Sequence, residues 1–418
     1  MPNVVLVFFV VLATQAQTIH VDANGHPSGN GSSQKPFNNI PAAVALAKTL
    51  GGSPNIRLEP GRYEITDTLN IENGVTLQGS NELVIDGQGW PTGVLVDPTE
   101  ETRIVGMPAL ADKPLINVGK TGQVIQGVRI SGLTLEAAKG DGAILIFKRV
   151  QDFEVRDSIL IGSTMIPNPK PVGIDAFASS GTIRDNYMSR LQGGAFISAG
   201  HAASPADVTF RDNRAVKNLL GIFLVGTSDG IPEQGNQLSV TIRDNDLSDN
   251  NAAQANSAGI RLLVKGRETS PGSGPSAGNI RAIIRNNRIV ANKTGIVIDA
   301  GFVSRLNGSA CDSRTFTGSV DLRLQGNTLA GSVERPAVVS FTQLQTTLGK
   351  LALASAQYLH NATFQIQDPD NVLAGKTLDH PAADPFVGGP CGVAGGTDQT
   401  KEMLGNLLID GSLVFPTP

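Results

Sequence analysis

The chain has little cysteine, few aromatic residues and almost no net charge. Its 418 residues include two cysteines, one tryptophan and 5% aromatic residues, and the formal net charge is −4. So weak a net charge gives no overall field that would attract nucleic acid or an anionic membrane surface, and we expect neither as a partner. Cys311 and Cys391 are accompanied by no CxxC motif and no paired histidines, which argues against a zinc site.

Long apolar runs are also missing beyond the first 16 residues. No later stretch approaches the roughly 20 apolar residues of a membrane span, so we expect no membrane insertion. The apolar block Val4 to Leu12, followed by the small-x-small site Thr14-Gln15-Ala16, is typical of a secretory signal. No Lys or Arg precedes that block, so a misassigned start or a buried first strand is the alternative. We predict a signal peptide over residues 1–17 and a secreted protein, extracellular or periplasmic.

In an oxidising compartment Cys311 and Cys391 are a candidate disulfide that would pin the C-terminal segment. Two unrelated free thiols are the alternative. Four Asn-x-Ser/Thr sequons have meaning only in a eukaryotic secretory pathway. They begin at Asn30, Asn292, Asn307 and Asn361.

A short phrase recurs along the middle of the chain: an apolar residue, Arg, Asp or Asn, and then a small amide or hydroxyl. A looser copy without the Arg closes on Asn327. The closing positions are 158, 186, 213, 245, 287 and 327, which gives steps of 28, 27, 32, 42 and 40 residues. A period with a floor near 27 residues plus insertions predicts a stacked repeat.

Each phrase is followed by a second run that begins at or beside a glycine and alternates apolar and variable residues, as a short strand with one buried face does. Short strands turned by Gly, Asn and Ser at this period predict a β-solenoid whose coils pair in parallel about 4.8 Å apart. Asparagines at the same corner of successive coils predict a ladder of side-chain hydrogen bonds. The second runs are Gly173 to Phe177, Gly194 to Ser198, Gly221 to Val225, Gly259 to Lys265 and Gly295 to Asp299.

With these features the sequence resembles the right-handed parallel β-helix proteins of the pectin-lyase-like superfamily over most of its length. Its opening is similar to theirs as well, with His20-Val21-Asp22, Lys35-Pro36-Phe37, Ile56 to Tyr63 and Gly74 to Gly79. The resemblance implies an all-β fold in which a helix over residues 40 to 50 caps the first coil.

We predict one elongated domain after the signal peptide. Residues 18–115 would form the N-terminal cap and first coils, 116–341 the central coils and 342–418 a C-terminal cap segment. That last segment loses the repeat and includes a candidate short helix around Gln343 to Ala356. It would cover the strand edges that a bare last coil exposes.

One outward column consists of five arginines in register, four of them followed by an aspartate. A ladder of ion pairs is the favoured interpretation, because the acids recur with the bases; a basic track for an acidic polysaccharide is the alternative. The arginines are Arg156, Arg184, Arg211, Arg243 and Arg285, and the aspartates are Asp157, Asp185, Asp212 and Asp244.

A second column, on the glycine-opened strands, changes residue type from coil to coil, as a binding groove with different subsites would. Its first outward position holds Asp175, Phe196, Phe223, Arg261 and Val297, and its second Phe177, Ser198, Val225, Leu263 and Asp299. Exposed phenylalanines beside charges suit a sugar chain, whose apolar faces stack on rings. We predict Phe177, Phe196, Phe223, His201 and Asp299 as substrate-binding residues. The long insertions after these strands, Thr227 to Gln237, Gly266 to Gly278 and Gly301 to Ser319, would wall the groove; the alternative is plain packing beneath tolerated loops.

The resemblance implies two main chemistries. Asp175 lies in a stretch similar to the first motif of polygalacturonase-like hydrolases, but Gly193-Gly194 occupy the place of the paired aspartates and no Gly-His-Gly follows. The Asp-Pro-His-Asp signature of alginate-epimerase-like proteins is missing, and so are pectin-methylesterase-like motifs.

Uronan lyases of the superfamily use an unprotonated Lys or Arg as base, with Ca²⁺ or basic residues neutralising the substrate's acid group. Lys265 and Arg261 are the candidate bases, and Asp175 or Asp299 the candidate cation ligands. The sequence therefore favours an exported protein that binds polysaccharide, with lyase action on an acidic glycan if it is an enzyme. The alternative is a non-catalytic surface or matrix protein, a spacer or adhesin.

Overall fold

The computed structural model describes residues 17–120, 122–137, 142–162, 171–200, 205–226, 236–250, 257–267, 278–304, 318–330, 335–340, 362–367 and 372–373. For residues 236, 264–267, 278, 298–304, 318–325, 329–330, 335–340, 362–367 and 372–373 it describes the backbone only.

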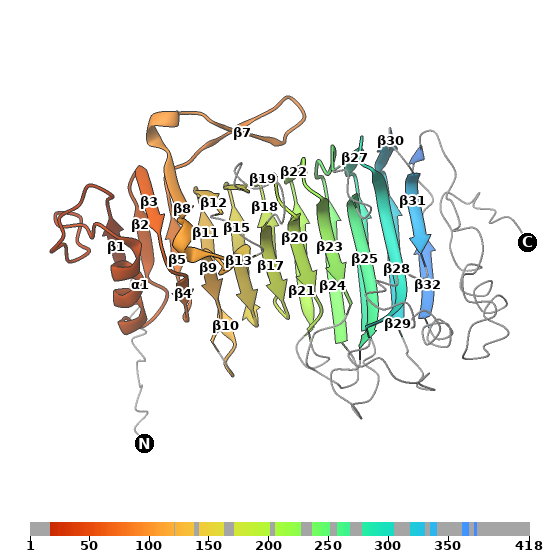
Figure 1. Ribbon diagram of the computed structural model, residues 1–418, viewed down its shortest axis with the longest axis horizontal. Coiled ribbons are helices and arrows are strands. Elements are labelled where there is room, and N and C mark those ends of the chain that lie inside the picture. Colours follow the sequence, from red (N-terminus) through yellow and green to blue (C-terminus); the bar gives the residue numbers. More distant parts are fainter. Residues whose placement is uncertain are drawn as a thin grey trace, which may run out of the picture.

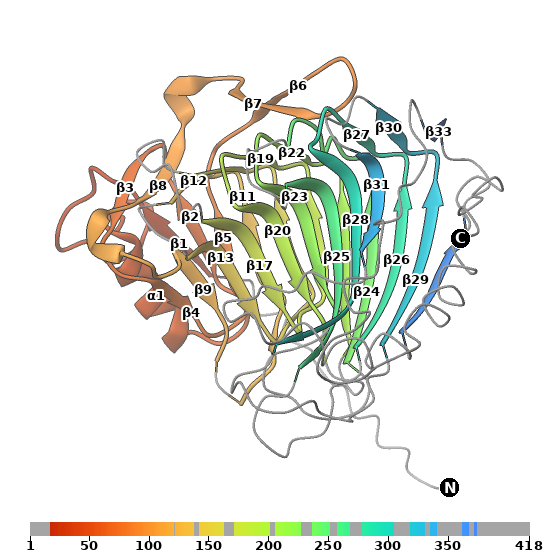
Figure 2. The ribbon, with the colours of Figure 1, turned by 45° about the vertical axis from the view of Figure 1, so that its right-hand side comes forward.

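The described chain winds into a long stack of coils whose strands form three parallel sheets (Figures 1 and 2). Each full coil contributes one strand to an 11-stranded sheet (sheet 1), then one to a shorter sheet (sheet 2), then one to a nine-stranded sheet (sheet 3). The fold is the right-handed parallel β-helix that the repeats predict.

The strands of the three sheets have the following bounds. Sheet 1 contains β1 (Thr18–Val21), β2 (Asn55–Leu58), β5 (Thr76–Gln78), β11 (Arg129–Ser131), β15 (Phe153–Arg156), β18 (Gly181–Arg184), β21 (Ala206–Arg211), β24 (Asn236–Arg243), β26 (Gly278–Arg285), β29 (Gly318–Gln325) and β32 (Ala362–Gln367). Sheet 2 contains β3 (Gly61–Ile65), β8 (Thr102–Gly106), β12 (Thr134–Glu136), β16 (Ile159–Ile161), β19 (Tyr187–Ser189) and β22 (Arg214–Val216), and bridges at Asp246 continue it to β27 (Arg288–Val290), β30 (Thr328–Ala330) and β33 (Val372–Leu373). Sheet 3 contains β4 (Leu69–Ile71), β9 (Ile116–Val118), β13 (Ala143–Lys148), β17 (Val172–Phe177), β20 (Gly193–Ser198), β23 (Leu220–Val225), β25 (Ala258–Arg267), β28 (Thr294–Ser304) and β31 (Arg335–Ser340).

The remaining elements are short. They are helix α1 (Ile40–Thr49), the 3-10 turns η1 (Pro98–Glu100) and η2 (Pro108–Leu110), the pair β10 (Ile125–Gln126) and β14 (Val150–Gln151), and the antiparallel hairpin of β6 (Leu83–Ile85) and β7 (Pro91–Leu95). No helix in the described part of the chain is long and apolar enough to cross a membrane.

The predicted asparagine ladder is present at the corner between sheets 1 and 2. Both the backbone N–H and the side-chain Nδ2 of Asn213 donate to Oδ1 of Asn245 in the next coil, at 2.9 and 3.3 Å. Nδ2 of Asn213 also donates to the carbonyls of Ile183 and Arg211 at 2.9 and 2.8 Å. The same pattern runs from Asn186 to Asn327, and Ser158 begins it by donating its N–H to Asn186. Each amide therefore satisfies buried backbone groups in two coils.

The residue before each ladder asparagine lies in the left-handed region. Its φ is between 50° and 61° at all six positions from 157 to 326. Asp and Asn tolerate this conformation better than other residues with a Cβ, and Gly tolerates it freely. The residues are Asp157, Asp185, Asp212, Asp244, Asn286 and Gly326. The recurring acid therefore has a conformational cause as well as an electrostatic one.

The five arginines are in register on the outward face of sheet 1, and four of them pair with the aspartate that follows in the same coil. Arg243 lies 2.7 Å from Asp244 and Arg184 lies 2.6 Å from Asp185, while Glu154 accepts from Arg184 at 2.8 Å. These contacts, with Glu154 first, raise the pKa of Arg184 against the opposing effect of burial. The ion-pair interpretation of this column fits the structure: the four Arg–Asp pairs are each made within one coil, and Glu154 adds a pair to Arg184 of the next coil.

A second asparagine ladder, which we did not expect, lies at the corner between sheets 2 and 3. The N–H of Asn218 donates to Oδ1 of Asn250 at 3.0 Å, and that of Asn250 donates to Oδ1 of Asn292 at 2.9 Å. All three side chains are buried. Asn292 is therefore a structural residue despite its sequon, because its amide is inaccessible in the folded chain.

The glycines that open the sheet 3 strands are fixed by close approach between coils. A Cβ added to Gly221 would lie 2.4 Å from the carbonyl oxygen of Gly259, and one added to Gly194 would lie 2.7 Å from that of Gly221. Real Cβ atoms do not come so close to backbone oxygen, so glycine recurs at this position in β17, β20, β23 and β25.

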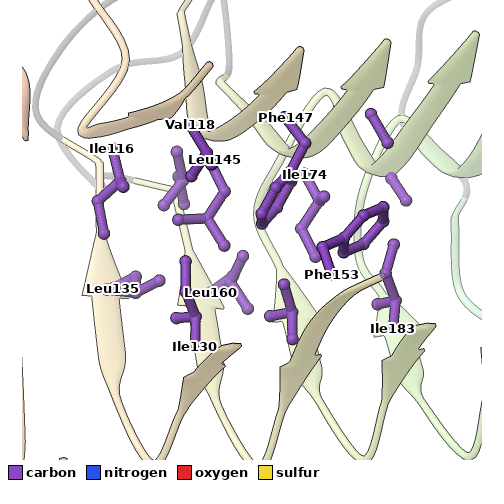
Figure 3. Packing of buried hydrophobic residues seen from close by; sticks show 14 of the residues in the cluster. Ile116, Val118, Ile130, Leu135, Leu145, Phe147, Phe153, Leu160, Ile174 and Ile183 are labelled. Carbon is purple, nitrogen blue, oxygen red and sulfur yellow. The ribbon is translucent and has the colours of Figure 1, made fainter. Parts of the chain in front are cut away.

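The core is a continuous column of stacked aliphatic side chains (Figure 3). Residues in register, such as Leu145 and Ile174, lie above one another on the inward face of their strands. Phe147 and Phe153 stack with ring centroids 4.4 Å apart. At the start of the column, α1 covers β1, β2 and β4, which confirms the predicted helical cap. Asn39 caps this helix by accepting from the N–H of Ala42 at 2.9 Å.

The antiparallel hairpin of β6 and β7 departs from the coil pattern, and it crosses over sheet 2 along the stack (Figure 2). Leu83 and Leu95 pack on Ile159, with Ile161 and Tyr187 beside them. At its tip Asp86 pairs with Arg214 at 3.0 Å, and the indole N–H of Trp90 donates to the carbonyl of Asp244 at 2.9 Å. The hairpin thus joins the first coils to coils much later in the chain.

The ladder predicts a large cost for removing one amide. We expect Asn213→Ala to lower the free energy of unfolding by at least about 2 kcal/mol, because buried donors and acceptors in neighbouring coils lose their partners. Urea denaturation followed by circular dichroism measures the change. The exposed Asn24→Ala is the matched control and should change stability by less than about 0.5 kcal/mol. Equal effects of the two substitutions would contradict the role of the ladder.

Candidate functional site

The outward face of sheet 3 carries the variable column that the sequence predicts. Asp175, Phe196, Phe223 and Arg261 lie in register on β17, β20, β23 and β25, and each is half-buried. The residues on either side of each, such as Ala195 and Ile197 around Phe196, are fully buried in the core. Strand alternation therefore holds these four side chains in one row on the surface.

The centre of the row is an aromatic pair with a cation over it. The rings of Phe196 and Phe223 meet edge to face, with centroids 5.0 Å apart. The guanidinium carbon of Arg261 lies 5.6 Å from the centroid of Phe223. Both contacts restrict the side chains, so the rings and the charge form a pre-ordered surface.

Asp175 on β17 is the register partner of Phe196, and Lys148 lies one strand further along the sheet, on β13. Burial raises the pKa of Asp175 to about 6, while the positive charge of Lys148 acts in the opposite direction. A half-buried carboxyl group with a pKa of about 6 is a candidate for binding or releasing a proton near neutral pH. Our sequence interpretation missed Lys148 because β13 has Ile144 at the register position where β17, β20, β23 and β25 have the glycine by which those strands were recognised.

Of the other predicted site residues, only Phe177 has a described side chain. Phe177 is half-buried on the outward face of β17, with Lys148 as its register partner on β13. Lys265 lies on β25 beyond a register shift between Val264 and Lys265, and Asp299 lies on β28 with Leu263 as its register partner. The side chains of Lys265 and Asp299, and the whole of His201, Cys311 and Cys391, lie outside the described residues.

Two details of the expected groove are different in the structure. Leu263 occupies an outward position but is buried, so it is part of the packing and not of a free surface. Strands β25 and β28 extend to Arg267 and Ser304, so the insertions after them begin later than the sequence suggests. These strands lengthen because they pair with each other beyond the bulge.

A Ca²⁺ site on this face is not formed by the described side chains. In that part of the chain, no three His, Cys, Asp or Glu residues come together as a metal cluster. Calcium takes about six to eight oxygen ligands, whereas Asp175 is a single carboxylate beside a lysine. We therefore assign no role to Ca²⁺ among these residues, and the expectation of a metal stays untested.

Comparisons with known proteins identify a family. The sequence profile of a family described as a protein of unknown function (DUF1565) matches residues 23–289, while no curated protein sequence matches the chain.

Three solved structures illustrate the similarity of fold. A pectate lyase, Pel9A, is 13% identical with a TM-score of 0.35 and covers 77% of this chain and 78% of its own. The A-module of the mannuronan C-5 epimerase AlgE4 from Azotobacter vinelandii is 14% identical with a TM-score of 0.36, over 88% and 98% of the two chains. A glycoside hydrolase is 8% identical with a TM-score of 0.30, over 80% and 98%. Similarity at this level carries no argument about activity.

The raised pKa of Asp175 predicts a pH dependence of stability. Since burial penalises only the charged carboxylate, the folded chain binds this proton more strongly than the unfolded chain does. The free energy of unfolding should fall as pH rises from about 4 to about 6, by up to about 2 kcal/mol. Urea denaturation across this range should show that Asp175→Asn removes this component.

The control is Asp207→Asn, an exposed carboxyl on β21 of sheet 1. Its pH profile should follow that of the unsubstituted protein. A profile for Asp175→Asn that matches the unsubstituted protein would show that the burial of Asp175 does not shift its titration.

Proposed function

Since the chain belongs to the family described as a protein of unknown function, DUF1565, we propose its function from its own surface: it binds an acidic polysaccharide along the outward face of sheet 3. The observation that carries this proposal is the in-register row of Asp175, Phe196, Phe223 and Arg261. The row runs along the stack, across coils that are otherwise uniform.

The aromatic pair supplies the apolar part of the binding surface. Sugar rings present C–H faces that stack on aromatic rings, and their hydroxyls take hydrogen bonds from polar neighbours. Phe196 and Phe223 are held edge to face and partly exposed, so little side-chain entropy is lost when a sugar packs on them. This surface suits an extended chain better than a small compact ligand, because the outward row continues over several coils.

Two cations give the surface its preference for an acidic chain. Lys148 and Arg261 lie on β13 and β25, four strand steps apart in sheet 3, which corresponds to about 19 Å at the usual strand spacing. Asp175 opposes them only in part, since its raised pKa leaves it partly protonated in mildly acidic conditions. We expect carboxylates of a uronan to meet Lys148 and Arg261 on either side of the phenylalanine pair.

Substitutions in the outward row of sheet 3 test whether this face binds polysaccharide. We expect Phe223→Ala and Arg261→Ala each to weaken binding of oligogalacturonate or oligomannuronate by at least about tenfold, since each removes a central contact of the surface. Isothermal titration calorimetry against a uronan panel measures the affinities. Arg62→Ala, an exposed arginine on β3 of sheet 2, is the matched charge control and should bind as the unsubstituted protein does. Unchanged affinity in both row variants would rule out this face.

A lyase reaction is the second candidate, and the pKa of Asp175 favours it. In such a reaction a base removes the proton beside the uronate carboxylate, the glycosidic C–O bond breaks, a C=C bond forms, and the leaving oxygen takes up a proton. Arg261, held over the ring of Phe223, stays charged and suits neutralisation of the carboxylate more than the role of base. Asp175, with a pKa of about 6, is the candidate base, and Lys265 is the other.

The lyase candidate is tested by the absorbance of the unsaturated product on a uronan panel, with and without Ca²⁺. If Asp175 is the base, we expect activity that rises through pH 6 and is lost in Asp175→Asn. If Lys265 is the base, activity should be lost in Lys265→Ala instead. The control is Arg62→Ala. Binding without product on any uronan would instead favour a non-catalytic surface or matrix protein.

Export is part of the proposal, and it is supported by the apolar block Val4 to Leu12 within the predicted signal peptide over residues 1–17. The protein would then meet its polysaccharide ligand outside the cytoplasm, in the extracellular space or the periplasm. N-terminal sequencing of the protein from culture fractions tests this point.

A further inference from the structure

A pocket of about 550 Å³ lies on the opposite side of the molecule from the predicted groove, between the β6–β7 hairpin and sheet 1. Its floor is the outward face of β2, β5, β11 and β15, and its roof is the stem of the hairpin. The lining residues on which the argument depends are Arg57, Gln78, Glu82, Ile85, Ser131 and Arg156.

The roof is fixed at its base and at its tip. At the base, Oδ1 of Asn81 accepts from the N–H of Thr102 at 2.6 Å, and its Nδ2 donates to the hydroxyl of Thr134 at 3.0 Å. At the tip, Asp86 and Trp90 hold the hairpin to coils further along the stack. Because both ends are anchored, the space beneath the hairpin is a built feature of the fold.

Most charges around the pocket are already paired. Arg156 contacts Asp157, Arg57 lies 3.5 Å from Glu59, and Asp185 is bound by Arg184. Such groups present oriented donors and acceptors but little free charge. Counting the lining residues alone, Glu59, Glu82, Asp157 and Asp185 outnumber Arg57 and Arg156, which disfavours a polyanion here.

Three lining groups have no partner. Within the described chain, the side chains of Gln78, Glu82 and Ser131 make no hydrogen bond. Ser131 is the most informative of them, because it is only 5% exposed and yet points outward from β11 beside Gln78, its register partner on β5. The Ser131 side chain is mostly covered, but its hydroxyl oxygen is not wholly buried, so it can donate to and accept from a ligand in the pocket.

We propose that this pocket binds a short neutral oligosaccharide, at a site independent of sheet 3. Sugar hydroxyls donate to Glu82 and the paired carboxylates and accept from Gln78, Arg57 and Ser131. Ile85, which is 50% exposed at the edge of the roof, offers an apolar surface to a C–H face of the sugar. The volume is in the range of pockets that hold small organic ligands.

The test uses xylotriose, cellotriose, maltotriose and mannotriose as neutral probes, with trigalacturonate as the acidic comparison. Binding to the full chain is followed by calorimetry and by the fluorescence of Trp90, the single tryptophan, which lies at the tip of the roof. We expect at least one neutral probe to bind, and Ser131→Ala and Gln78→Ala each to weaken it by about three- to tenfold, as the loss of one hydrogen bond does. Thr209→Ala, which removes an outward hydroxyl from β21 of the same sheet outside the pocket, should leave the affinity unchanged.

The outcomes separate this site from the face on sheet 3. Loss of neutral-sugar binding in Ser131→Ala, with trigalacturonate binding unchanged, supports two sites. Neutral-sugar binding that is lost in Phe223→Ala but kept in Ser131→Ala and Gln78→Ala would overturn the pocket while leaving the sheet 3 proposal in place. Failure of all four neutral probes to bind at millimolar concentration would also overturn it.

Discussion

Hydrogen bonds between asparagine side chains of successive coils hold the strands of this protein in register. The amide of each ladder residue satisfies backbone groups of its own coil and of a neighbouring coil, so a shift of one coil against the next would leave several buried polar groups without partners. Register in turn decides which side chains become neighbours on the outside. Phe196 and Phe223, 27 residues apart in sequence, meet edge to face only because their coils are aligned.

The same architecture gives the molecule two different surfaces for which we propose ligands. Sheet 3 presents an open row in which residue type changes at each coil, which suits contacts distributed along an extended chain. Sheet 1 repeats Arg and Asp from coil to coil, and a partly covered pocket forms where the β6–β7 hairpin lies over it. An open face and a roofed pocket impose different demands on a ligand, which is why we assign a polysaccharide to the first and a short neutral sugar to the second.

Periodic features could be predicted from the sequence because each coil must form the same turns and the same hydrogen bonds to its neighbours. The Arg-Asp-Asn phrase predicted the ladder and the register, and the glycine-opened runs predicted the sheet 3 row.

The second ladder was not predicted, although Asn218, Asn250 and Asn292 each follow a first-ladder asparagine by five residues. The pocket could not be predicted because the hairpin that covers it occurs once and has no periodic pattern. The hairpin's partners, Arg214 and Asp244, are more than 120 residues away from it in the sequence. Only the Asp86-Gly87 turn marks the hairpin in the sequence. The roles of Lys265, His201 and Asp299 depend on side chains outside the described residues and stay predictions.

Cross-linking between coils tests the register most directly. Thr209 and Thr241 are register partners on β21 and β24, and partners in a parallel sheet are about 4.8 Å apart, within the Cα range of a disulfide. The pair Thr209→Cys and Thr241→Cys should therefore form a disulfide on oxidation, identified by mass spectrometry of the linked peptides. The pair Thr209→Cys and Ser239→Cys, two residues out of register, should not. A cross-link in the second pair and none in the first would contradict the alignment on which both binding surfaces depend.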